Sequence, residues 1–300
     1  MPPKYSPYLP LILLLLLGSI WGTGYSIARF AMINGVNPLG YSFWQSLGPA
    51  ILITALVWIK RLPLPFSFAH CRYYLICGLT GIALPNTNMY FAAPHLPAGI
   101  LAVVVNTVPL MAYLMALMAG LERFNVMRLA SVAVALCGLM LLLIPKSSLP
   151  APDMIPWVLT ALLTPLCFAF CSVYITRFRP PNSNSFSLAA GTLIFSSALL
   201  APLIVWTHSF YSFHIPVTLP DAVVLLEIVL SSIGYLLFFQ LLKIAGPVYY
   251  SFVDTVVAIT GLAWGYIIFA EKLNIWTGAA VTLILLSLLM ISKQQLNKVK

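Results

Sequence analysis

Two acidic residues, Asp254 and Glu227, lie within long apolar stretches of the chain. An ionised side chain in hydrocarbon is costly, so it is retained only where it faces a cavity or a partner. A carboxylate in such a place can bind a proton, or the ammonium or cationic part of a small molecule, which makes both residues candidates for proton coupling. Two plainer roles stay open. Asp254 could be a protonated group hydrogen-bonded between helices, and Glu227 an interfacial residue that reaches lipid headgroups.

Aromatic and amide side chains recur at helical spacing in the same kind of apolar sequence. Trp21, Tyr25 and Arg29 follow one another at intervals of four, which places them on one helix face. Arg29 could meet a carboxylate of a solute or act as an interfacial anchor. Packing between helices is the alternative role for each aromatic residue. The residues that we predict to line a substrate site are Trp21, Tyr25, Gln45, Asn86, Tyr90, Asn106, Tyr113, Tyr250 and Asp254.

The composition indicates what kind of element must position these side chains. Hydrophobic residues make up 61% of the 300-residue chain and charged residues only 7%, whereas a soluble domain carries about 25% charged residues. The formal net charge is +9, but the basic residues stand singly or in pairs at the ends of apolar stretches. We therefore expect the lipid bilayer as the partner of these charges, and no nucleic acid.

Ten apolar stretches are long enough to cross a membrane as helices, which takes about 20 residues at 1.5 Å per residue. In this scheme Asp254 lies roughly 12 Å from the end of its helix, and Glu227 roughly 9 Å from the end of another. The fold class predicted is an all-α membrane protein. The ten predicted spans are residues 9–28, 38–59, 73–93, 98–121, 129–144, 155–176, 186–206, 222–242, 248–270 and 276–291.

The basic residues predict the orientation of these spans. With the N-terminus in the cytoplasm, twelve of the 15 Lys and Arg residues fall on the cytoplasmic side, and only Arg29, Lys146 and Lys272 fall outside. Cytoplasmic connections carry such an excess, so we expect both termini inside, in a bacterial-type cytoplasmic (inner) membrane. Lys4 and the leucine run after it resemble a signal peptide, but we interpret them as an uncleaved anchor because the first repeat needs this helix.

Two short motifs recur in the second half of the chain. Residues 121–125 (LERFN) match residues 270–274 (AEKLN) at an offset of 149, and residues 27–30 match residues 175–178 at nearly the same offset. The matches divide the chain into two five-helix repeats, residues 1–148 and 149–300, within a single membrane domain. Because five is an odd number, the second repeat must enter the membrane from the opposite side. Inverted repeats of this kind place a substrate site near the membrane midplane.

Several of these motifs resemble the EamA family of the drug/metabolite transporter superfamily. They are Trp21-Gly22, Thr107-Val108-Pro109-Leu110, Gly120-Leu121-Glu122-Arg123 and Ala270-Glu271-Lys272-Leu273 with Gly278. The resemblance implies a secondary transporter, commonly an exporter of amino acids or other small metabolites, without an ATP-binding part. The chain departs from the family pattern at Trp44-Gln45, where many members have an arginine after an aromatic, and at Ala258, where a proline is expected.

No motif of an enzyme accompanies these features. The sequence has no HExxH, no GxSxG and no phosphate-binding glycine loop, so we expect neither catalysis, nor a metal, nor a cofactor. A secondary active or facilitative transporter of small polar or amphipathic metabolites, working by alternating access, is the main prediction. A non-transporting membrane partner subunit or a lipid-handling protein is the alternative. The faces of small residues fit packing within a monomer or between the copies of a homodimer.

Overall fold

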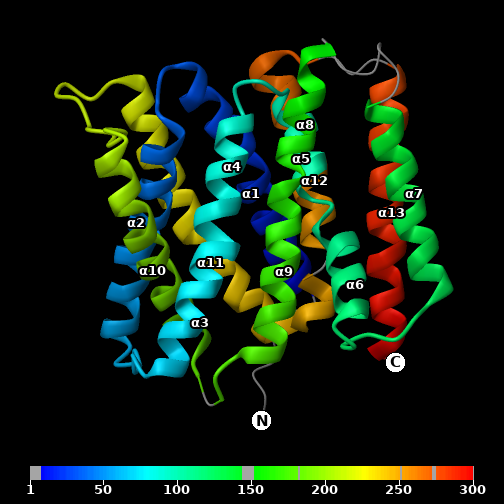
Figure 1. Cartoon of the computed structure of the whole chain (residues 1–300), viewed down its shortest axis with the longest axis horizontal. Helices are drawn as coiled ribbons and strands as arrows, with labels where there is room; N and C mark the ends of the chain where they lie inside the picture. The colour runs from blue at the N-terminus through cyan, green and yellow to red at the C-terminus, as the bar shows by residue number, and fades with distance from the viewer. Residues whose placement is uncertain (1–7, 144–151, 182, 251, 272–274, 300) are drawn as a thin grey trace.

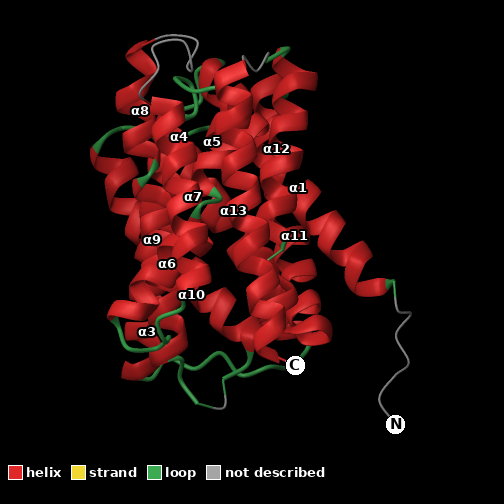
Figure 2. Ribbon diagram, turned by 90° about the vertical axis from the view of Figure 1, so that its right-hand side faces the viewer, coloured by secondary structure: helices red, strands yellow, loops and turns green. Residues whose placement is uncertain are grey.

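The protein is a bundle of long helices that run roughly parallel to one axis (Figure 1). The computed structural model describes residues 8–143, 152–181, 183–250, 252–271 and 275–299, and these residues contain no β-strand (Figure 2). In chain order the elements are α1 (Leu9–Ile33), α2 (Pro38–Ile59), α3 (Phe68–Gly78), the π-helical turn η1 (Leu79–Ala83), α4 (Leu84–Ala92), α5 (Ala98–Val105), α6 (Val108–Met118), α7 (Val126–Leu143), the 3-10 turn η2 (Pro152–Met154), α8 (Ile155–Ala161), α9 (Leu163–Phe178), α10 (Ser185–Trp206), α11 (Leu219–Tyr250), α12 (Val253–Phe269) and α13 (Ile275–Val299).

Length and composition make this a multi-pass membrane protein. Within the described chain, six segments are long and apolar enough to cross a bilayer. Shorter apolar helices, among them α12, accompany them. The six segments are Leu9–Ile33, Pro38–Ile59, Ala98–Met118, Ile155–Phe178, Ser185–Trp206 and Leu219–Phe238.

Three of the predicted spans are interrupted helices. The span predicted at 98–121 breaks between α5 and α6, where Asn106 and Thr107 leave the helical conformation and Pro109 lies in the first turn of the second piece. A proline lacks a backbone N–H, so it is tolerated in the first turn of a new helix. The π-helical turn η1 divides the span predicted at 73–93, and residue 162 separates α8 from α9. Such breaks are retained in membranes where the freed backbone groups face protein or a cavity.

The boundary predicted between the eighth and ninth spans is wrong. Residues 243–247 were expected to form a connection, but α11 continues as helix through them to Tyr250, and α12 begins only at Val253. The rings of Phe238 and Tyr250 lie 4.9 Å apart, although twelve residues of straight helix span about 18 Å. The axis of α11 must therefore bend between these two residues, and the Gly246-Pro247 pair of the sequence supplies a usual cause.

This bend moves Asp254 into the first turn of α12 rather than deep within a helix. The turn nevertheless lies near the middle of the bundle, because Tyr250 contacts Trp21, which is halfway along α1. Gly22 of α1 makes the close approach of the two helices feasible. A Cβ at this position would lie 2.0 Å from Oγ1 of Thr260 on α12, a distance that real Cβ atoms do not reach. The start of α12 is thus held against the centre of α1.

Helices from the first half of the chain pack mainly on helices from the second half. α1 lies along α11 and α12, α2 along α10, α3 along α10, α6 against α9 and α7 along α13. The pairs α2/α10 and α7/α13 occupy opposite edges of the bundle (Figure 1). The halves are therefore interleaved rather than placed side by side.

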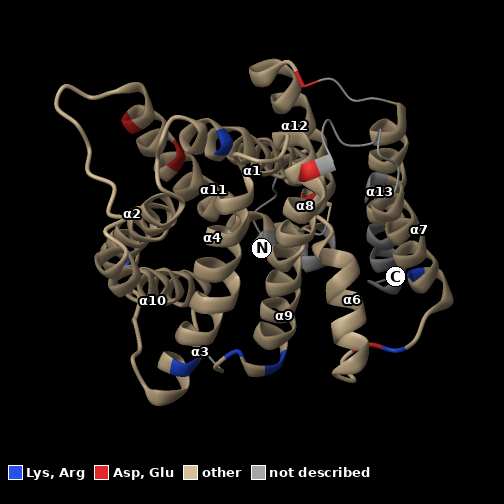
Figure 3. Cartoon of the chain, turned by 45° about the horizontal axis from the view of Figure 1, so that its top comes forward, with Lys and Arg blue, Asp and Glu red and all other residues tan. Residues whose placement is uncertain are grey.

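The charged side chains are concentrated at the ends of the helices (Figure 3). Lys and Arg gather where α3 and α9 meet the connections, and the lengths of most helices carry no charge (Figure 3). We call the end that carries the last turns of α6 and α9 the α6 end, and the opposite one, where α5 begins and α12 finishes, the α5 end (Figure 1).

Candidate functional site

Trp21 is the centre of an aromatic group between α1, α11 and α12. Its ring contacts those of Tyr235, Phe238 and Tyr250 at centroid distances of 6.4, 5.9 and 6.5 Å. The bend of α11 creates this arrangement, since it returns Tyr250 to the level of Phe238. The structure thus brings Trp21 and Tyr250, both predicted site residues, into contact. Tyr235 also joins this group. It lies on α11, two helical turns after Glu227 and on the same face.

Tyr25 lies one turn further along α1 and connects this aromatic group to the break between α5 and α6. The side-chain amide of Asn106 donates a hydrogen bond of 3.0 Å to the hydroxyl of Tyr25 and another of 2.7 Å to the carbonyl oxygen of Ala102. Asp254 is within electrostatic range of both Tyr25 and Tyr250. The amide of Asn106 at the α5–α6 break is therefore bonded to the phenol of Tyr25 on α1, with the carboxylate of Asp254 on α12 nearby.

Glu227 lies in a second polar group, between α11 and α2. The hydroxyl of Ser231 is 3.1 Å from Oε1 of Glu227 and 3.1 Å from Oε1 of Gln45. Gly24 of α1 lies directly against the carboxylate, since a Cβ there would be 3.0 Å from Oε1 of Glu227. Tyr41 and Tyr90, whose rings are 4.6 Å apart, are within electrostatic range of the same carboxylate. The predicted residues Gln45 and Tyr90 thus adjoin Glu227.

Three polar atoms in this second group have no hydrogen-bond partner in the described part of the chain. They are the hydroxyl of Tyr41, Nε2 of Gln45 and Oε2 of Glu227, whose residues are 0%, 4% and 9% exposed. Leaving buried polar atoms unpaired costs about 1–3 kcal/mol each. Unpaired buried atoms therefore call for a partner such as an ordered water, an ion or a ligand. Within the described chain, no Lys, Arg or His forms an ion pair with Glu227 or Asp254.

Accessibility divides the site into two parts. Tyr41, Tyr90 and Glu227 are buried and lie within about 12 Å of the helix termini at the α5 end. Trp21, Tyr235, Tyr250 and Asp254, near the middle of the bundle, are only half-buried although helices surround them. The side chains of the site near the α5 end are therefore more completely buried than these four near the middle of the bundle.

Two predicted residues stand apart from this group. The hydroxyl of Tyr113 accepts a 2.9 Å hydrogen bond from the backbone N–H of Asn125, and its ring lies 5.4 Å from the guanidinium of Arg128. Tyr113 thus contacts the α6–α7 connection and is not part of the group around Trp21. Asn86 is half-buried in α4 and has no side-chain hydrogen bond to the described part of the chain, whereas Asn88 donates to Thr160 and Thr164 and so joins α4 to the α8–α9 break.

Arg29 and Glu271 form an ion pair at the α5 end. The two carboxylate oxygens of Glu271 also accept hydrogen bonds from the backbone N–H groups of Ala98, at 2.6 Å, and Gly99, at 3.0 Å. These are the first residues of α5, whose unpaired N–H groups and helix dipole favour an anion. Arg29 therefore has a partner within the protein, and the sequence offered no signal for this contact.

The connection between α10 and α11 covers the site from the α5 end. The indole N–H of Trp44 donates a 2.9 Å hydrogen bond to the carbonyl oxygen of Tyr211, and its ring contacts Phe213 at 5.0 Å. The fully buried carboxylate of Asp221 accepts hydrogen bonds from the hydroxyl of Tyr211, at 2.5 Å, and from the backbone N–H of Thr218, at 2.8 Å. Burial and this carboxylate raise the pKa of Tyr211 to about 12, so its hydroxyl remains a donor.

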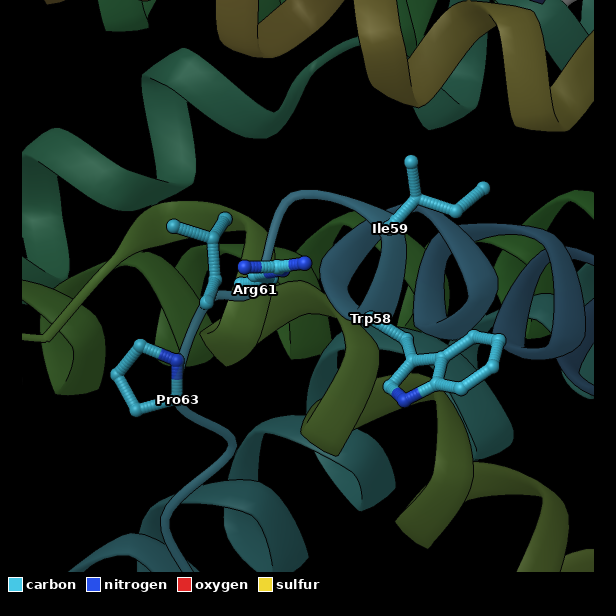
Figure 4. Close-up of a pocket in the computed structure, with 5 residues that line it drawn as sticks. Trp58, Ile59, Arg61 and Pro63 are labelled. Carbon is cyan, nitrogen blue, oxygen red and sulfur yellow. The ribbon is translucent and has the colours of Figure 1, made fainter.

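A separate depression lies at the last turn of α2, far along that helix from Tyr41 and Gln45. It is lined by Trp58, Ile59, Arg61, Leu62 and Pro63 (Figure 4) and is a shallow, open hollow of about 600 Å³. Trp58 and Ile59 are 82% and 72% exposed. An aromatic ring beside a cation at the end of a membrane helix is typical of the lipid interface, so we assign this depression to lipid contact. The described chain contains no group of three or more His, Cys, Asp and Glu residues that could hold a metal.

Comparisons with known proteins agree with this architecture. A solved structure described as "Crystal structure of protein" superposes with a TM-score of 0.64 and 18% sequence identity, over 95% of this chain and 96% of the other. At that identity the likeness extends to the fold alone. No curated protein sequence matches the chain significantly. The pattern of the EamA-like transporter family matches twice, over residues 9–144 and 155–293. Because the two matches span nearly the whole chain as two repeats, this protein belongs to the EamA-like transporter family.

Proposed function

We propose that this protein is a secondary active or facilitative transporter of small polar or amphipathic metabolites, with export as its direction. The observation that carries the proposal is the continuous polar and aromatic group in the bundle, which contains two carboxylates without a cationic partner in the described chain. Residues that would contact the substrate are Trp21, Tyr25, Gln45, Tyr90, Asn106, Tyr250 and Asp254, with Asn86 at the margin. Tyr113 would support the site only indirectly.

The proposed substrate is an amino acid or a related zwitterionic or cationic solute. Asp254 is half-buried near the middle of the bundle, within electrostatic range of Tyr25 and Tyr250. A carboxylate near aromatic side chains suits an ammonium group, which can gain both an ion pair and cation–π contacts. Glu227 and Asp254 are also the proposed proton-coupling groups. Loss of a proton on one side of the membrane and its return on the other would couple transport to a pH gradient.

The proposed mechanism is alternating access by two inverted five-helix repeats, residues 1–148 and 149–300, which together make ten spans. The packing supports this scheme. The contact of α1 with α12 is a contact between the first and the ninth predicted spans, and that of α6 with α9 is a contact between the fourth and the sixth. In two five-span repeats, the first span corresponds to the sixth and the fourth to the ninth. The two contacts are therefore equivalent under a two-fold relation between the repeats. The charge distribution favours cytoplasmic termini in a bacterial-type inner membrane.

A binding screen over several chemical classes tests this function while the substrate is unidentified. The purified protein in detergent is heated with amino acids, polyamines, quaternary amines and nucleosides in turn. A compound that binds only the folded state at a hundredfold excess over its Kd adds about 2.7 kcal/mol of stability. We expect a saturable rise in unfolding temperature for one class that carries an ammonium group. The Asp254→Asn variant should lose the rise, and Asp153→Asn, an exposed acid outside the site, should keep it.

Proteoliposomes then test movement of the compound. Wild-type protein should carry it across the bilayer, and a pH gradient should drive its accumulation. Glu227→Gln should still exchange the compound but should no longer concentrate it in response to the gradient. If no compound raises the unfolding temperature of the folded protein, this proposal is contradicted, and a lipid-handling or partner-subunit role is favoured.

A further inference from the structure

Two buried thiols from different halves of the chain lie side by side between α3 and α9. Cys77 is the second-last residue of α3, and Cys171 lies in the middle of α9. The two residues are 2% and 6% exposed and belong to one cluster of buried side chains. Each thiol is within hydrogen-bonding range of the other. Because α3 packs directly on α9, this contact joins the first half of the chain to the second.

The backbone that follows Cys77 brings α9 close to it. The π-helical turn η1 begins two residues after Cys77, and such turns occur frequently at functional sites. Gly81, within this turn, leaves the space that the sulfur of Cys171 occupies, since a Cβ there would lie 2.7 Å from that sulfur. The sulfur of Cys171 therefore lies against the turn of helix that runs from Cys77 to Gly81.

The thiol pair adjoins the candidate site. Tyr235 is within electrostatic range of Cys171, and the ring of this tyrosine contacts that of Trp21. Tyr235 is itself half-buried. Cys171 lies about 10 Å from the last residue of α9 at the α6 end, at 1.5 Å per residue. The pair thus lies inside the bundle, beside residues of the candidate site, and is not part of the surface that faces lipid.

Two adjacent thiols can undergo a reaction that a single thiol cannot. A peroxide oxidises one thiol to a sulfenic acid and releases one water, and the second thiol then displaces the hydroxyl group as a second water. Two protons and two electrons leave the thiols, one S–S bond forms, and the O–O bond of the peroxide breaks. A reductant returns the disulfide to two thiols. Because the sulfurs are already neighbours, this bond requires rotation of side chains rather than movement of helices.

We propose that Cys77 and Cys171 form a redox-sensitive site, at which a peroxide produces a reversible disulfide between the halves of the chain and thereby arrests transport. The arrest rests on the alternating access proposed above, which requires the two repeats to move relative to each other. A hydrogen bond from His70 to Ser183 already links the α3 and α9 regions at the α6 end, but such a bond can break and re-form within a cycle. A disulfide persists until it is reduced.

Mapping the disulfide tests the site without a substrate. Full-length protein with Cys71→Ser and Cys137→Ser, which removes the two thiols that are not buried, is treated with hydrogen peroxide in lipid nanodiscs. After free thiols are blocked, mass spectrometry of the digest should find Cys77 linked to Cys171, and a phosphine reductant should remove the link. Cys167→Ser, one turn away on α9, should keep the link. Absence of the link, or a link from Cys171 to Cys167 in its place, would overturn the site.

Proteoliposomes test the arrest. Peroxide should abolish most of the transport by the reduced protein, and the reductant should restore it. Cys77→Ala and Cys171→Ala should each transport in the presence of peroxide, and either variant serves if the other does not fold. Full transport by protein in which the disulfide is complete would overturn the arrest. Because the disulfide is mapped without a substrate, a reduced protein that forms the link but transports nothing refutes the proposed function and leaves the site standing.

Discussion

At the scale of single residues, two buried carboxylates differ in their hydrogen bonds. Glu227 has an oxygen without a partner in the described chain, whereas the carboxylate of Asp221 accepts bonds from Tyr211, Thr218 and His214. A fully satisfied buried acid orders the structure around it, and an unsatisfied one is available for a ligand or a proton. The hydrogen bonds of Asp221 therefore indicate a structural role, and those of Glu227 agree with the functional role proposed for it.

Asp221→Ala should loosen the connection that covers the site. The change leaves the backbone N–H of Thr218 and the hydroxyl of Tyr211 without their acceptor, which destabilises the connection. We expect a lower apparent unfolding temperature and faster proteolysis within residues 209–218, which mass spectrometry of the fragments would locate. Asp153→Ala, an exposed acid in η2, is the matched control. Equal proteolysis of the two variants would show that Asp221 does not hold the connection.

At the scale of elements, the close approach of α1 and α12 depends on a glycine. Gly22→Val inserts a branched side chain where Thr260 and the backbone of Val257 already lie within 3 Å of a Cβ. Overpacking of this kind costs about 1–3 kcal/mol or more. We expect a drop of several degrees in the unfolding temperature, measured by the fluorescence of the purified protein. Gly278→Ala in α13, where a Cβ meets nothing within 4 Å, should be neutral or slightly stabilising. Similar unfolding temperatures for the two variants would contradict the view that the α1–α12 contact depends on Gly22.

The sequence predicted the long helices better than their interruptions. The second predicted span coincides with α2, because a polar cap at Asn37 and a proline at its first position are local signals. Gly246-Pro247 is also a local signal, but for a turn, and the helix continues through it with a bend. The local sequence alone does not determine whether a helix bends or ends at such a pair. Here the bend is accompanied by contacts of the Tyr250 ring with Trp21 and Phe238, which a local pattern does not contain.

The candidate site was predictable as a set of residue types but not as a set of contacts. Intramembrane acids, amides and prolines singled out Asp254, Gln45 and Asn106 from the sequence. Tyr41 escaped notice, because a tyrosine at a helix interface has the same local pattern whether it packs or binds. Arg29 and Glu271 are separated by 242 positions, so no local pattern can report their pairing.

At the scale of the whole molecule, the half-buried centre and the closed α5 end predict one-sided access. In a variant with Cys71 and Cys137 replaced by serine, Tyr250→Cys should react with a membrane-impermeant maleimide only from the side of the α6 end. Tyr41→Cys should stay unreactive from both sides, since that position is 0% exposed. Mass spectrometry of labelled vesicles of known orientation measures both rates. Equal labelling of Tyr250→Cys from the two sides would contradict a bundle closed at one end.

The interleaved packing of the two halves has a consequence for how the protein is made. α1, α2 and α7 find their main neighbours only in α10 to α13, which leave the ribosome last. Until then the first half of the chain must remain in the bilayer with those faces covered by lipid. Residues 1–148 expressed alone should therefore be degraded, and co-expression with residues 149–300 as a separate chain should rescue them. Biogenesis, not only transport, then requires both repeats to be present together.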